Sequence, residues 1–281
     1  MSSVHDEMLR DLKRGGYAKR TVDIYMRSIE EFASFHARPI DELGPHDVRR
    51  WVDELQEQID AHPARWAQHM AALKFLYTRT LDKPANVSFL RQRRGPTKET
   101  PVLLLKEVPR LFAAFRERRY RAFYQFLFGT GLRFSEARLI EVQDIWSTRS
   151  MIHVRPEIAK RQRERYVPLP QTLLELLRGY YREVRPALPW LFASCKGTPL
   201  DPGSTRSALK QAAAEAGIRI VMTPYVLRHT YATQMLAHGQ DLRFVQTVLG
   251  HASIQSTVRY THVLVEQIAA SPSPLDFLNK V

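Results

Sequence analysis

The chain has 281 residues, of which 44% are hydrophobic, and it contains a single cysteine, Cys195. This length and composition can fill one large domain or two modest ones, and one cysteine excludes an internal disulfide and a zinc site built on cysteines. The formal net charge of +13 indicates a polyanionic partner, because Lys and Arg displace counterions from phosphates. A basic protein without a nucleic-acid partner is the alternative.

Two further features concern the compartment. No apolar run approaches the length of a membrane span, and the first residues, MSSVHDEMLRDLKRGG, lack the apolar core of a signal peptide. We therefore expect a soluble protein in a reducing, cytoplasmic compartment, with no membrane partner.

Residues 4–80 predict helices throughout and no strand. Apolar side chains recur at intervals of three and four residues, as on the buried faces of a helical bundle. These faces comprise Val22, Tyr25, Met26, Ile29, Phe32 and Phe35, then Val48, Trp51, Val52 and Leu55, and then Trp66, Met70, Leu73 and Tyr77. Pro39, Pro45 and Pro63 mark the breaks between the helices.

The composition changes between residues 83 and 101. Three prolines and a run of basic residues from Arg91 to Lys98 leave no apolar face to bury. We predict a basic interdomain linker here, suited to lie along a nucleic acid. A solvated hinge without such a contact is the alternative.

The second domain is predicted to begin at residue 102 with two helices, Lys106–Arg116 and Arg119–Phe128. Gly129 and Gly131 then predict a tight turn, which a residue with a side chain would resist. This turn places Arg133 near the start of a helix over Ser135–Val142.

Two short β-rich runs follow, Met151–Val154 and Arg165–Leu169, and they predict a hairpin. Lys160 lies in the polar connection between them. Helices are predicted after the hairpin over Gln171–Glu183 and Ser204–Glu215.

Residues 223–263 combine short amphipathic helices with unusually many polar side chains. In the helix Val226–Leu236, Arg228 and His229 share a face with Tyr225, which could meet a ligand. A second helix runs from Asp241, a predicted N-cap, to Leu249, and Gly250 follows as a C-cap. His251 therefore emerges at a helix terminus, and a third short helix carries Tyr260 back toward it.

Several of these stretches share their order and spacing with one enzyme family. They are Gly129-Thr130-Gly131-Leu132-Arg133-Phe134-Ser135-Glu136-Ala137, Lys160 to Leu169, Leu227-Arg228-His229, Leu249-Gly250-His251 and Tyr260-Thr261-His262. Together they resemble the arginine, lysine, histidine and tyrosine boxes of the tyrosine recombinases, the phage-integrase and Xer family. Each stretch alone is a weak signal, and their common order carries the resemblance.

The resemblance implies a mainly α fold with a small β-sheet. Residues 1–82 would form an all-helical core-binding domain that clamps DNA, and residues 83–101 the linker. Residues 102–281 would form a mixed α/β catalytic domain that ends in an apolar tail, 271–281. The tail would dock on a neighbouring protomer, and the alternative is that it folds back on its own domain. We expect no arm-binding domain before the first helices, which would favour the simpler Xer type over the large phage integrases.

The resemblance also assigns catalytic roles that suit phosphodiester chemistry. Tyr260 would be the nucleophile that forms a covalent phosphotyrosine. Arg133 and Arg228 would neutralise the transition-state phosphate, Lys160 would protonate the leaving 5′ oxygen, and His251 would hydrogen-bond the scissile phosphate. No metal ion and no other cofactor is expected.

Three neighbouring residues receive lesser roles. The family usually has a histidine where this chain has Tyr225. A phenol can hydrogen-bond a phosphate but is a poor base at neutral pH, so general base catalysis is in question here. Glu136 is expected to orient an arginine, and His229 to pack or hydrogen-bond near the site.

The implied function is that of a site-specific recombinase or integrase that exchanges DNA strands through a 3′-phosphotyrosyl intermediate and a Holliday junction. Its partners would be double-stranded DNA with paired half-sites, further copies of itself in a synaptic tetramer, and a second recombinase or an accessory protein, in the cytoplasm at the nucleoid. A type IB topoisomerase-like or telomere-resolving enzyme is one alternative. A non-catalytic DNA-binding accessory factor on the same scaffold is another.

Overall fold

A computed structural model of the chain describes residues 2–59, 63–90 and 100–250. The chain divides into two compact units, Met1–Lys98 and Glu99–Val281, which we describe separately. Helices dominate both units and a small sheet occurs in the second, so the predicted fold class is confirmed. None of the helices within the described ranges is long and apolar enough to cross a membrane.

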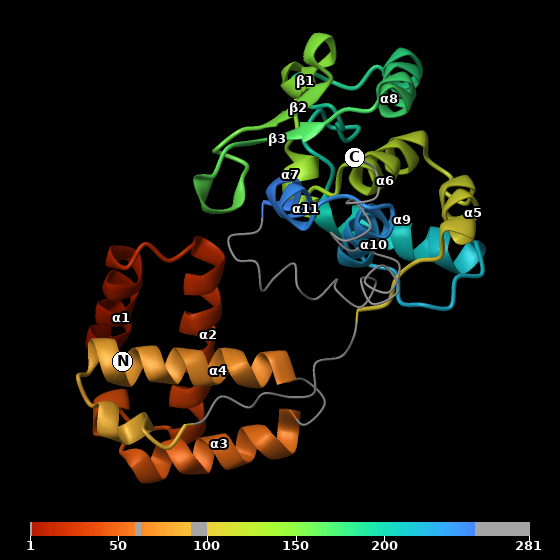
Figure 1. Cartoon of the computed structure of the whole chain (residues 1–281). Coiled ribbons are helices and arrows are strands. Elements are labelled where there is room, and N and C mark those ends of the chain that lie inside the picture. Colours follow the sequence, from red (N-terminus) through yellow and green to blue (C-terminus); the bar gives the residue numbers. More distant parts are fainter. Residues whose placement is uncertain (1, 60–62, 91–99, 251–281) are drawn as a thin grey trace, which may run out of the picture. The chain divides into compact units, whose positions relative to one another are not determined.

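All the regular secondary structure in the described residues of the first unit is helical, as predicted (Figure 1). Its helices are α1 (Ser2–Arg14), α2 (Lys19–His36), α3 (Pro45–Ile59) and α4 (Pro63–Phe75), with a π turn, η2 (Leu76–Thr80), after α4. The predicted apolar faces meet in one core, in which Phe32 and Tyr77 are fully buried. The hydroxyl of Tyr77 donates a hydrogen bond of 3.0 Å to the Leu43 carbonyl, so this buried polar atom is satisfied.

The first unit extends beyond residue 82, where we placed the end of the first domain. A 3-10 turn, η3 (Pro84–Val87), follows Lys83, and Val87 and Leu90 are buried in the core of the first unit. The prediction overlooked these two apolar residues because they stand between prolines and polar residues and show no helical period. The basic run itself, residues 91–98, lies outside the described ranges.

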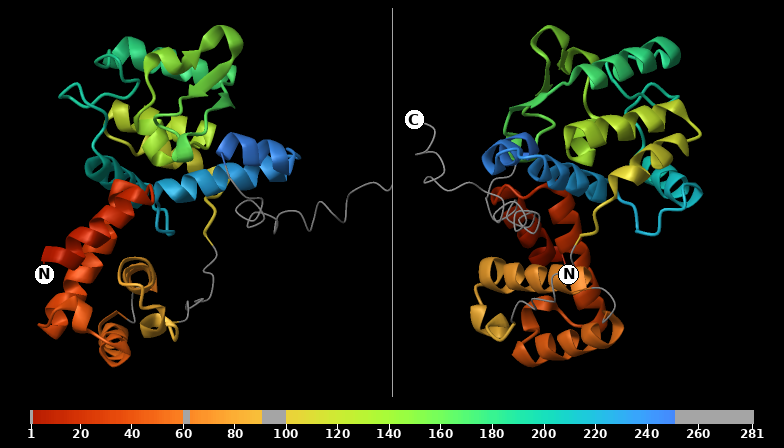
Figure 2. Two further views of the ribbon diagram at one scale, coloured as in Figure 1. Left: turned by 90° about the vertical axis from the view of Figure 1, so that its left-hand side faces the viewer. Right: turned by 45° about the vertical axis from the view of Figure 1, so that its right-hand side comes forward.

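The second unit contains seven described α-helices and one sheet (Figure 1). The helices are α5 (Val108–Ala113), α6 (Arg118–Thr130), α7 (Phe134–Arg138), α8 (Gln171–Val184), α9 (Pro202–Glu215), α10 (Pro224–Ala237) and α11 (Leu242–Leu249). Helix α10 packs against α6 and α11, and in both views of Figure 2 α11 lies beside the sheet, where it contacts the strand β3 (Arg165–Pro168). The apolar sides of these elements form one core.

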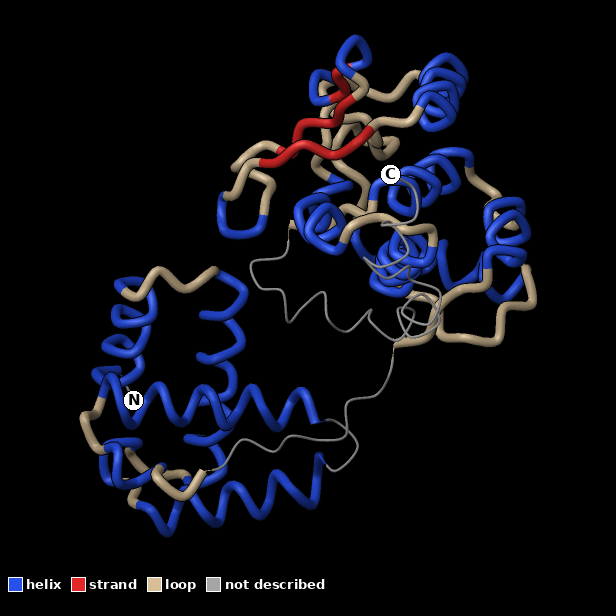
Figure 3. Tube along the Cα trace, viewed as in Figure 1, coloured by secondary structure: helices blue, strands red, loops and turns tan. Residues whose placement is uncertain are grey.

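The sheet is antiparallel, in the order β1 (Ile145–Trp146), β2 (Met151–Val154) and β3. Ile152 pairs with Val167, and both point into the core. Figure 3 shows the connection between β2 and β3 extending beyond the strands, with the helical turn η7 (Lys160–Gln162) in it. The predicted hairpin is confirmed. Strand β1 was not predicted, because two residues are too few for a period to be detected.

Two predictions around the first arginine box are wrong. Gly129 lies inside α6, and only Gly131 takes the left-handed conformation, with φ of 63°, that ends this helix. Helix α7 ends at Arg138 rather than at residue 142. The amide of Val142 instead donates to the Pro189 carbonyl, since this segment pairs with a distant loop and cannot continue the helix.

Gly131 is expected to tolerate no side chain. A Cβ at this position would come within 2.7 Å of Cε1 of Tyr231, in addition to the strain of its positive φ. Gly131→Ala should lower the free energy of unfolding by about 2–5 kcal/mol, the sum of left-handed strain and overpacking.

The matched control is Gly217→Ala. Gly217 has a φ of 66°, but a Cβ added to it would meet no atom of the described residues within 4 Å. This variant should therefore lose only the strain, about 1–2 kcal/mol. Urea unfolding of both variants measures the difference. Equal losses would show that the contact with Tyr231 has no consequence for stability.

Candidate active site

Three arginines from distant parts of the sequence converge on the C-terminal end of α11. Arg133 precedes α7, Arg165 opens β3, and Arg228 lies within α10. The hydrogen bonds run from Arg165 Nε to the Val248 carbonyl (2.9 Å), from Arg228 Nη2 to the Leu249 carbonyl (2.7 Å) and from Arg133 Nη2 to the Gly250 carbonyl (2.7 Å). The last carbonyls of a helix have no partner within it, so they are free to accept these bonds. We call the three residues the arginine cluster.

A buried carboxylate stabilises the arginine cluster. Glu136 is fully buried and accepts from Arg133 Nη1 at 2.8 Å and from Arg165 Nη2 at 2.6 Å, while its second contact with Arg165 measures 3.2 Å. Burial by itself would raise the pKa of Glu136, but the hydrogen bonds and charge of Arg165 and then those of Arg133 lower it to about 2. Glu136 is therefore ionised at neutral pH and offsets the repulsion between the guanidinium groups.

The end of α11 contributes charge as well as acceptors. Aligned peptide dipoles give a helix C-terminus a partial negative charge, which favours cations there. The arginine cluster therefore lies between two negative groups, the carboxylate of Glu136 and the helix terminus. This arrangement explains how three like charges can be held close together.

Arg228 joins two motifs that are distant in sequence. Its side chain is buried, and Nη1 donates a 2.8 Å hydrogen bond to the Gly131 carbonyl while Nη2 contacts Leu249. The turn after α6 and the end of α11 are thus fixed to one side chain. Arg228 lies in α10, whose N-cap, Thr223, accepts a bond from the Val226 amide.

The glycine of the Leu249-Gly250-His251 motif has a geometric reason. Gly250 ends α11 with a φ of 63°, which favours glycine. A Cβ on Gly250 would also lie 3.1 Å from three guanidinium atoms of Arg165. Glycine is therefore required at position 250 for two reasons, the left-handed end of the helix and the close approach of Arg165.

The structure places Lys160 in the connection between β2 and β3. Lys160 is exposed and begins the turn η7 in the hairpin connection. The strand β3 that follows it begins at Arg165, whose side chain binds Glu136 and the Val248 carbonyl.

Tyr225 and His229 form a stacked pair on α10. Their ring centroids are 6.3 Å apart and the rings are inclined by 12°. Tyr225 is 50% exposed, whereas His229 and Arg228 are buried. Burial lowers the pKa of His229, against a smaller raising effect of its hydrogen bond with the Thr100 backbone. Of the face that we predicted to meet a ligand, only Tyr225 is open to solvent.

The remaining predicted site residues, His251 and Tyr260, and the tail 271–281 lie outside the described residues.

Arg165 is a site residue that the sequence analysis did not single out. Its signal was its position, because it stands two residues before Val167 and thus on the inward face of the strand. A charged residue on the buried face of a strand needs a partner, and Glu136 is that partner.

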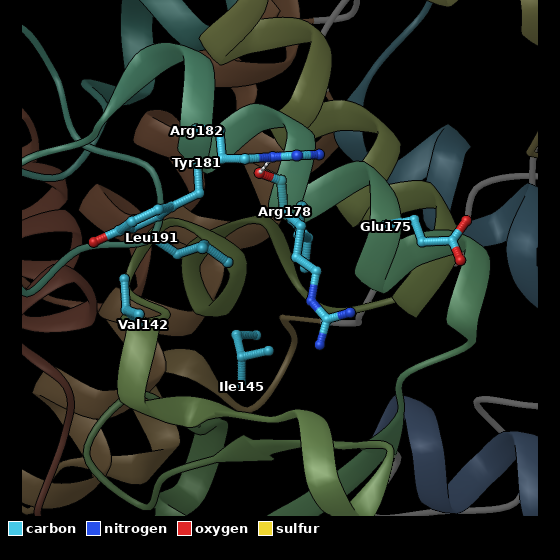
Figure 4. A pocket seen from close by; sticks show the side chains of 8 residues that line it. Val142, Ile145, Glu175, Arg178, Tyr181, Arg182 and Leu191 are labelled. Atoms are coloured by element: carbon cyan, nitrogen blue, oxygen red, sulfur yellow. Dashed lines mark hydrogen bonds between the residues drawn. The ribbon is translucent and has the colours of Figure 1, made fainter.

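A separate cavity of about 660 Å³ lies beside α8 (Figure 4). It is lined by Val142, Ile145, Glu175, Leu177, Arg178, Tyr181, Arg182 and Leu191. The Arg178 side chain points from α8 into this space. None of the predicted site residues lines it.

Within the described ranges no group of three or more His, Cys, Asp or Glu side chains is placed to hold a metal ion.

Comparison with known proteins identifies the family. Residues 101–267 match the model of the phage integrase family, and residues 5–86 match that of the phage integrase N-terminal SAM-like domain. The chain belongs to the phage integrase family of tyrosine recombinases. The predicted family is thereby confirmed.

Full-length relatives support the same conclusion. An integrase/recombinase of Escherichia coli is 30% identical over 320 residues, covering 98% of this chain and 94% of the relative. Tyrosine recombinase XerD of Staphylococcus aureus (strain N315) is 29% identical over 291 residues, covering 95% and 96%. This chain is therefore a site-specific DNA recombinase, as predicted.

Solved structures share the fold of the recombinase. The crystal structure of XerA recombinase is 26% identical, with a TM-score of 0.55, and the match covers 96% of this chain and 98% of XerA. A lambda integrase dimer bound to a COC' core site has a TM-score of 0.76 at 18% identity, covering 92% and 94%. At 18% identity the likeness to lambda integrase concerns the fold alone.

Proposed function

We propose that the recombinase cleaves and rejoins DNA through a covalent bond between Tyr260 and the 3′ phosphate. The phenolic oxygen of Tyr260 attacks the scissile phosphorus and loses its proton, while the 5′ oxygen leaves and takes up a proton. The phosphotyrosyl bond retains the energy of the phosphodiester, so rejoining requires no ATP. A second round of exchange resolves a Holliday junction. No metal ion is needed, because arginines supply the positive charge.

The observation that supports this proposal most is the arginine cluster. Arg133 and Arg228 come from two different motifs and meet at one helix end, as residues that hold a single phosphate must. Planar guanidinium groups match phosphate oxygens, and charge held in place before the reaction stabilises the transition state. The Arg133 side chain is 23% exposed, so it can reach a phosphate with its remaining N–H groups.

The other assigned residues complete the chemistry. Lys160, exposed in the hairpin connection, would protonate the leaving 5′ oxygen as a general acid. His251 would hydrogen-bond the scissile phosphate. It follows directly on Gly250, whose carbonyl binds Arg133. Glu136 would hold Arg133 in place.

The partners follow from the relatives and the charge of the chain. Lambda integrase has been crystallised as a tetramer bound to a Holliday junction, and XerH bound to its difH substrate. By analogy, this recombinase binds two half-sites of duplex DNA as a dimer and forms a tetramer in synapsis, in the cytoplasm at the nucleoid. The first unit would clamp the DNA, the second would catalyse, and the tail 271–281 would dock on a neighbouring protomer. A second recombinase or accessory protein completes the set of proposed partners.

A suicide substrate tests the proposal. In a recombination site nicked near the cleavage point, the short strand diffuses away after cleavage and traps the protein on the DNA. We expect a covalent adduct on the 3′ side, and recombinant products from two intact sites. Specific binding without an adduct would identify a DNA-binding accessory factor. Cleavage and relaxation without recombinants would identify a topoisomerase-like or telomere-resolving enzyme.

Variants of the stacked pair test which residue faces the phosphate. Because Tyr225 is exposed and His229 is buried, we expect Tyr225 to be the one that contacts DNA. Tyr225→Phe should raise the barrier to cleavage by roughly 0.5–1.5 kcal/mol, the value of one hydrogen bond. Tyr225→His should cleave as fast as the wild type or faster, because imidazole titrates near neutral pH and can act as a general base.

His229→Ala is the comparison for these variants. We expect it to lower the denaturation midpoint and to leave the cleavage rate per folded molecule nearly unchanged. Single-turnover cleavage is measured against pH for all three variants. A collapse of the rate in His229→Ala alone, at unchanged stability, would make His229 the base instead.

A further inference from the structure

We infer that Arg165 is a positioning residue for strand cleavage, which acts through Glu136 on Arg133 and through the Val248 carbonyl on the end of α11. The inference rests on the proposed function. It concerns a residue that would not touch the DNA but would determine the geometry of those that do.

The described hydrogen bonds of Arg165 are all made with other groups of the protein. The residue is only 8% exposed and lies at an inward position of β3. Its two Nη atoms bind the two carboxylate oxygens of Glu136, and its Nε binds the Val248 carbonyl. The planar guanidinium group of Arg165, bonded to Glu136 and to Val248, fixes the orientation of both partners, which the ammonium group of a lysine could not do.

The first consequence concerns Arg133. The same Glu136 oxygen, Oε1, accepts from Arg133 at 2.8 Å and from Arg165 at 3.2 Å, so the carboxylate is shared. Without Arg165, the buried carboxylate would have Arg133 as its one remaining arginine partner. Arg133 would then be drawn toward Glu136 and away from a phosphate oxygen, or Glu136 would take up a proton and release Arg133. Either change misplaces the charge.

The second consequence concerns the chain that leads to His251. Each of the last three described carbonyls, those of Val248, Leu249 and Gly250, is held by a different arginine. Removing Arg165 releases the first of these anchors. The geometry of the end of α11, after which His251 follows in the sequence, would then be less well defined.

Arg155 provides a matched control in the same hairpin. Arg155 comes directly after β2, the strand that pairs with β3, and its side chain binds Glu141 at 2.8 Å and Asp144 at 2.9 Å. It is thus also an ion-paired arginine that is largely withdrawn from solvent, but its described contacts do not include the arginine cluster. A general loss of hairpin stability should affect Arg155 and Arg165 variants alike.

The test compares Arg165→Met with Arg155→Met in the full chain. Methionine replaces the aliphatic stem of arginine with an apolar side chain and removes the charge and all donors. We expect Arg165→Met to cleave on the order of a hundredfold more slowly in a single turnover, the loss typical of a misplaced catalytic group. Its affinity for the recombination site should stay close to that of the wild type. Arg155→Met should keep the wild-type rate per folded molecule.

A methylphosphonate at the scissile position separates positioning from folding. This group lacks one negative oxygen, so the reaction depends less on a well-placed Arg133. On this duplex the loss of rate in Arg165→Met, relative to wild type, should largely disappear, as it should in Arg133→Ala. A defect in folding would persist equally on both substrates. In an Arg133→Ala background, Arg165→Met should add less than its full loss, because the effect through Arg133 is already gone and only the effect on the end of α11 remains.

Several results would overturn the inference. They are wild-type cleavage by Arg165→Met, an equal loss on both substrates, and losses that multiply fully with Arg133→Ala. If Arg165→Met fails to fold, Arg165→Lys replaces it, because it keeps a charge for Glu136 without the two-pronged contact; undiminished cleavage by Arg165→Lys would equally overturn the inference. Failure of the wild type to form any adduct would count against the proposed function instead.

Discussion

Tyr260→Phe should abolish covalent attachment to DNA while leaving sequence-specific binding nearly unchanged. The substitution removes the oxygen that attacks phosphorus, and the phenylalanine ring has no other atom that could act as the nucleophile. Binding is dominated by contacts of Lys and Arg with many phosphates, which the substitution does not alter. The expected result is complete loss of the adduct on a suicide substrate at a binding constant within a factor of a few of the wild type.

Tyr225→Phe is the matched control for this experiment, since it removes a hydroxyl from a tyrosine of the same domain. It should still form the adduct. A 3′-phosphotyrosyl adduct in Tyr260→Phe would show that another residue is the nucleophile. Digestion of that adduct and mass spectrometry would identify it.

Arg133→Ala should slow cleavage by about 10²–10³-fold, which corresponds to about 2.7–4 kcal/mol for the loss of one preorganised donor to a developing charge. The fold should tolerate this change, because Glu136 keeps its two contacts with Arg165. Arg228→Ala should lose activity as well, but it also leaves the carbonyls of Gly131 and Leu249 without these donors, so its stability should fall too. Arg133→Ala therefore isolates the chemistry better.

Single-turnover cleavage and urea unfolding measured on the same preparations separate the two effects. Arg138→Ala serves as control, since Arg138 belongs to the same short helix, α7, and binds the Leu200 carbonyl rather than the arginine cluster. It should cleave at the wild-type rate per folded molecule. If Arg133→Ala did the same, Arg133 would have a structural role only.

The helices with a clear period were predictable from the sequence, and so was the hairpin. Helix α11 begins after Asp241, whose carboxylate accepts from the amides of residues 243 and 244, and it ends at Gly250, as its capping residues predicted. The shortness of α7 was not predictable, because it results from a bond between Val142 and Pro189 that no local pattern records. The same is true of Val87 and Leu90, which pack on a core formed earlier in the chain.

The site shows a similar division. Motif order selected Arg133 and Arg228, and the structure brings both to the end of α11. That each binds a particular backbone carbonyl depends on contacts across 117 and 21 residues of sequence, respectively, which no motif encodes. Arg165 was overlooked because it stands among other basic residues of the hairpin, where only the alternation of buried and exposed positions distinguishes it.

The attachment of the arginine cluster to the end of α11 determines at which step, folding or strand cleavage, the side-chain conformational entropy is lost. An arginine side chain has about 2 kcal/mol of rotamer entropy to lose when it is fixed. Here Arg133, Arg165 and Arg228 are already held by backbone carbonyls in the absence of DNA, so most of this entropy is given up when the domain folds. The penalty therefore falls on the stability of the domain rather than on the barrier to strand cleavage.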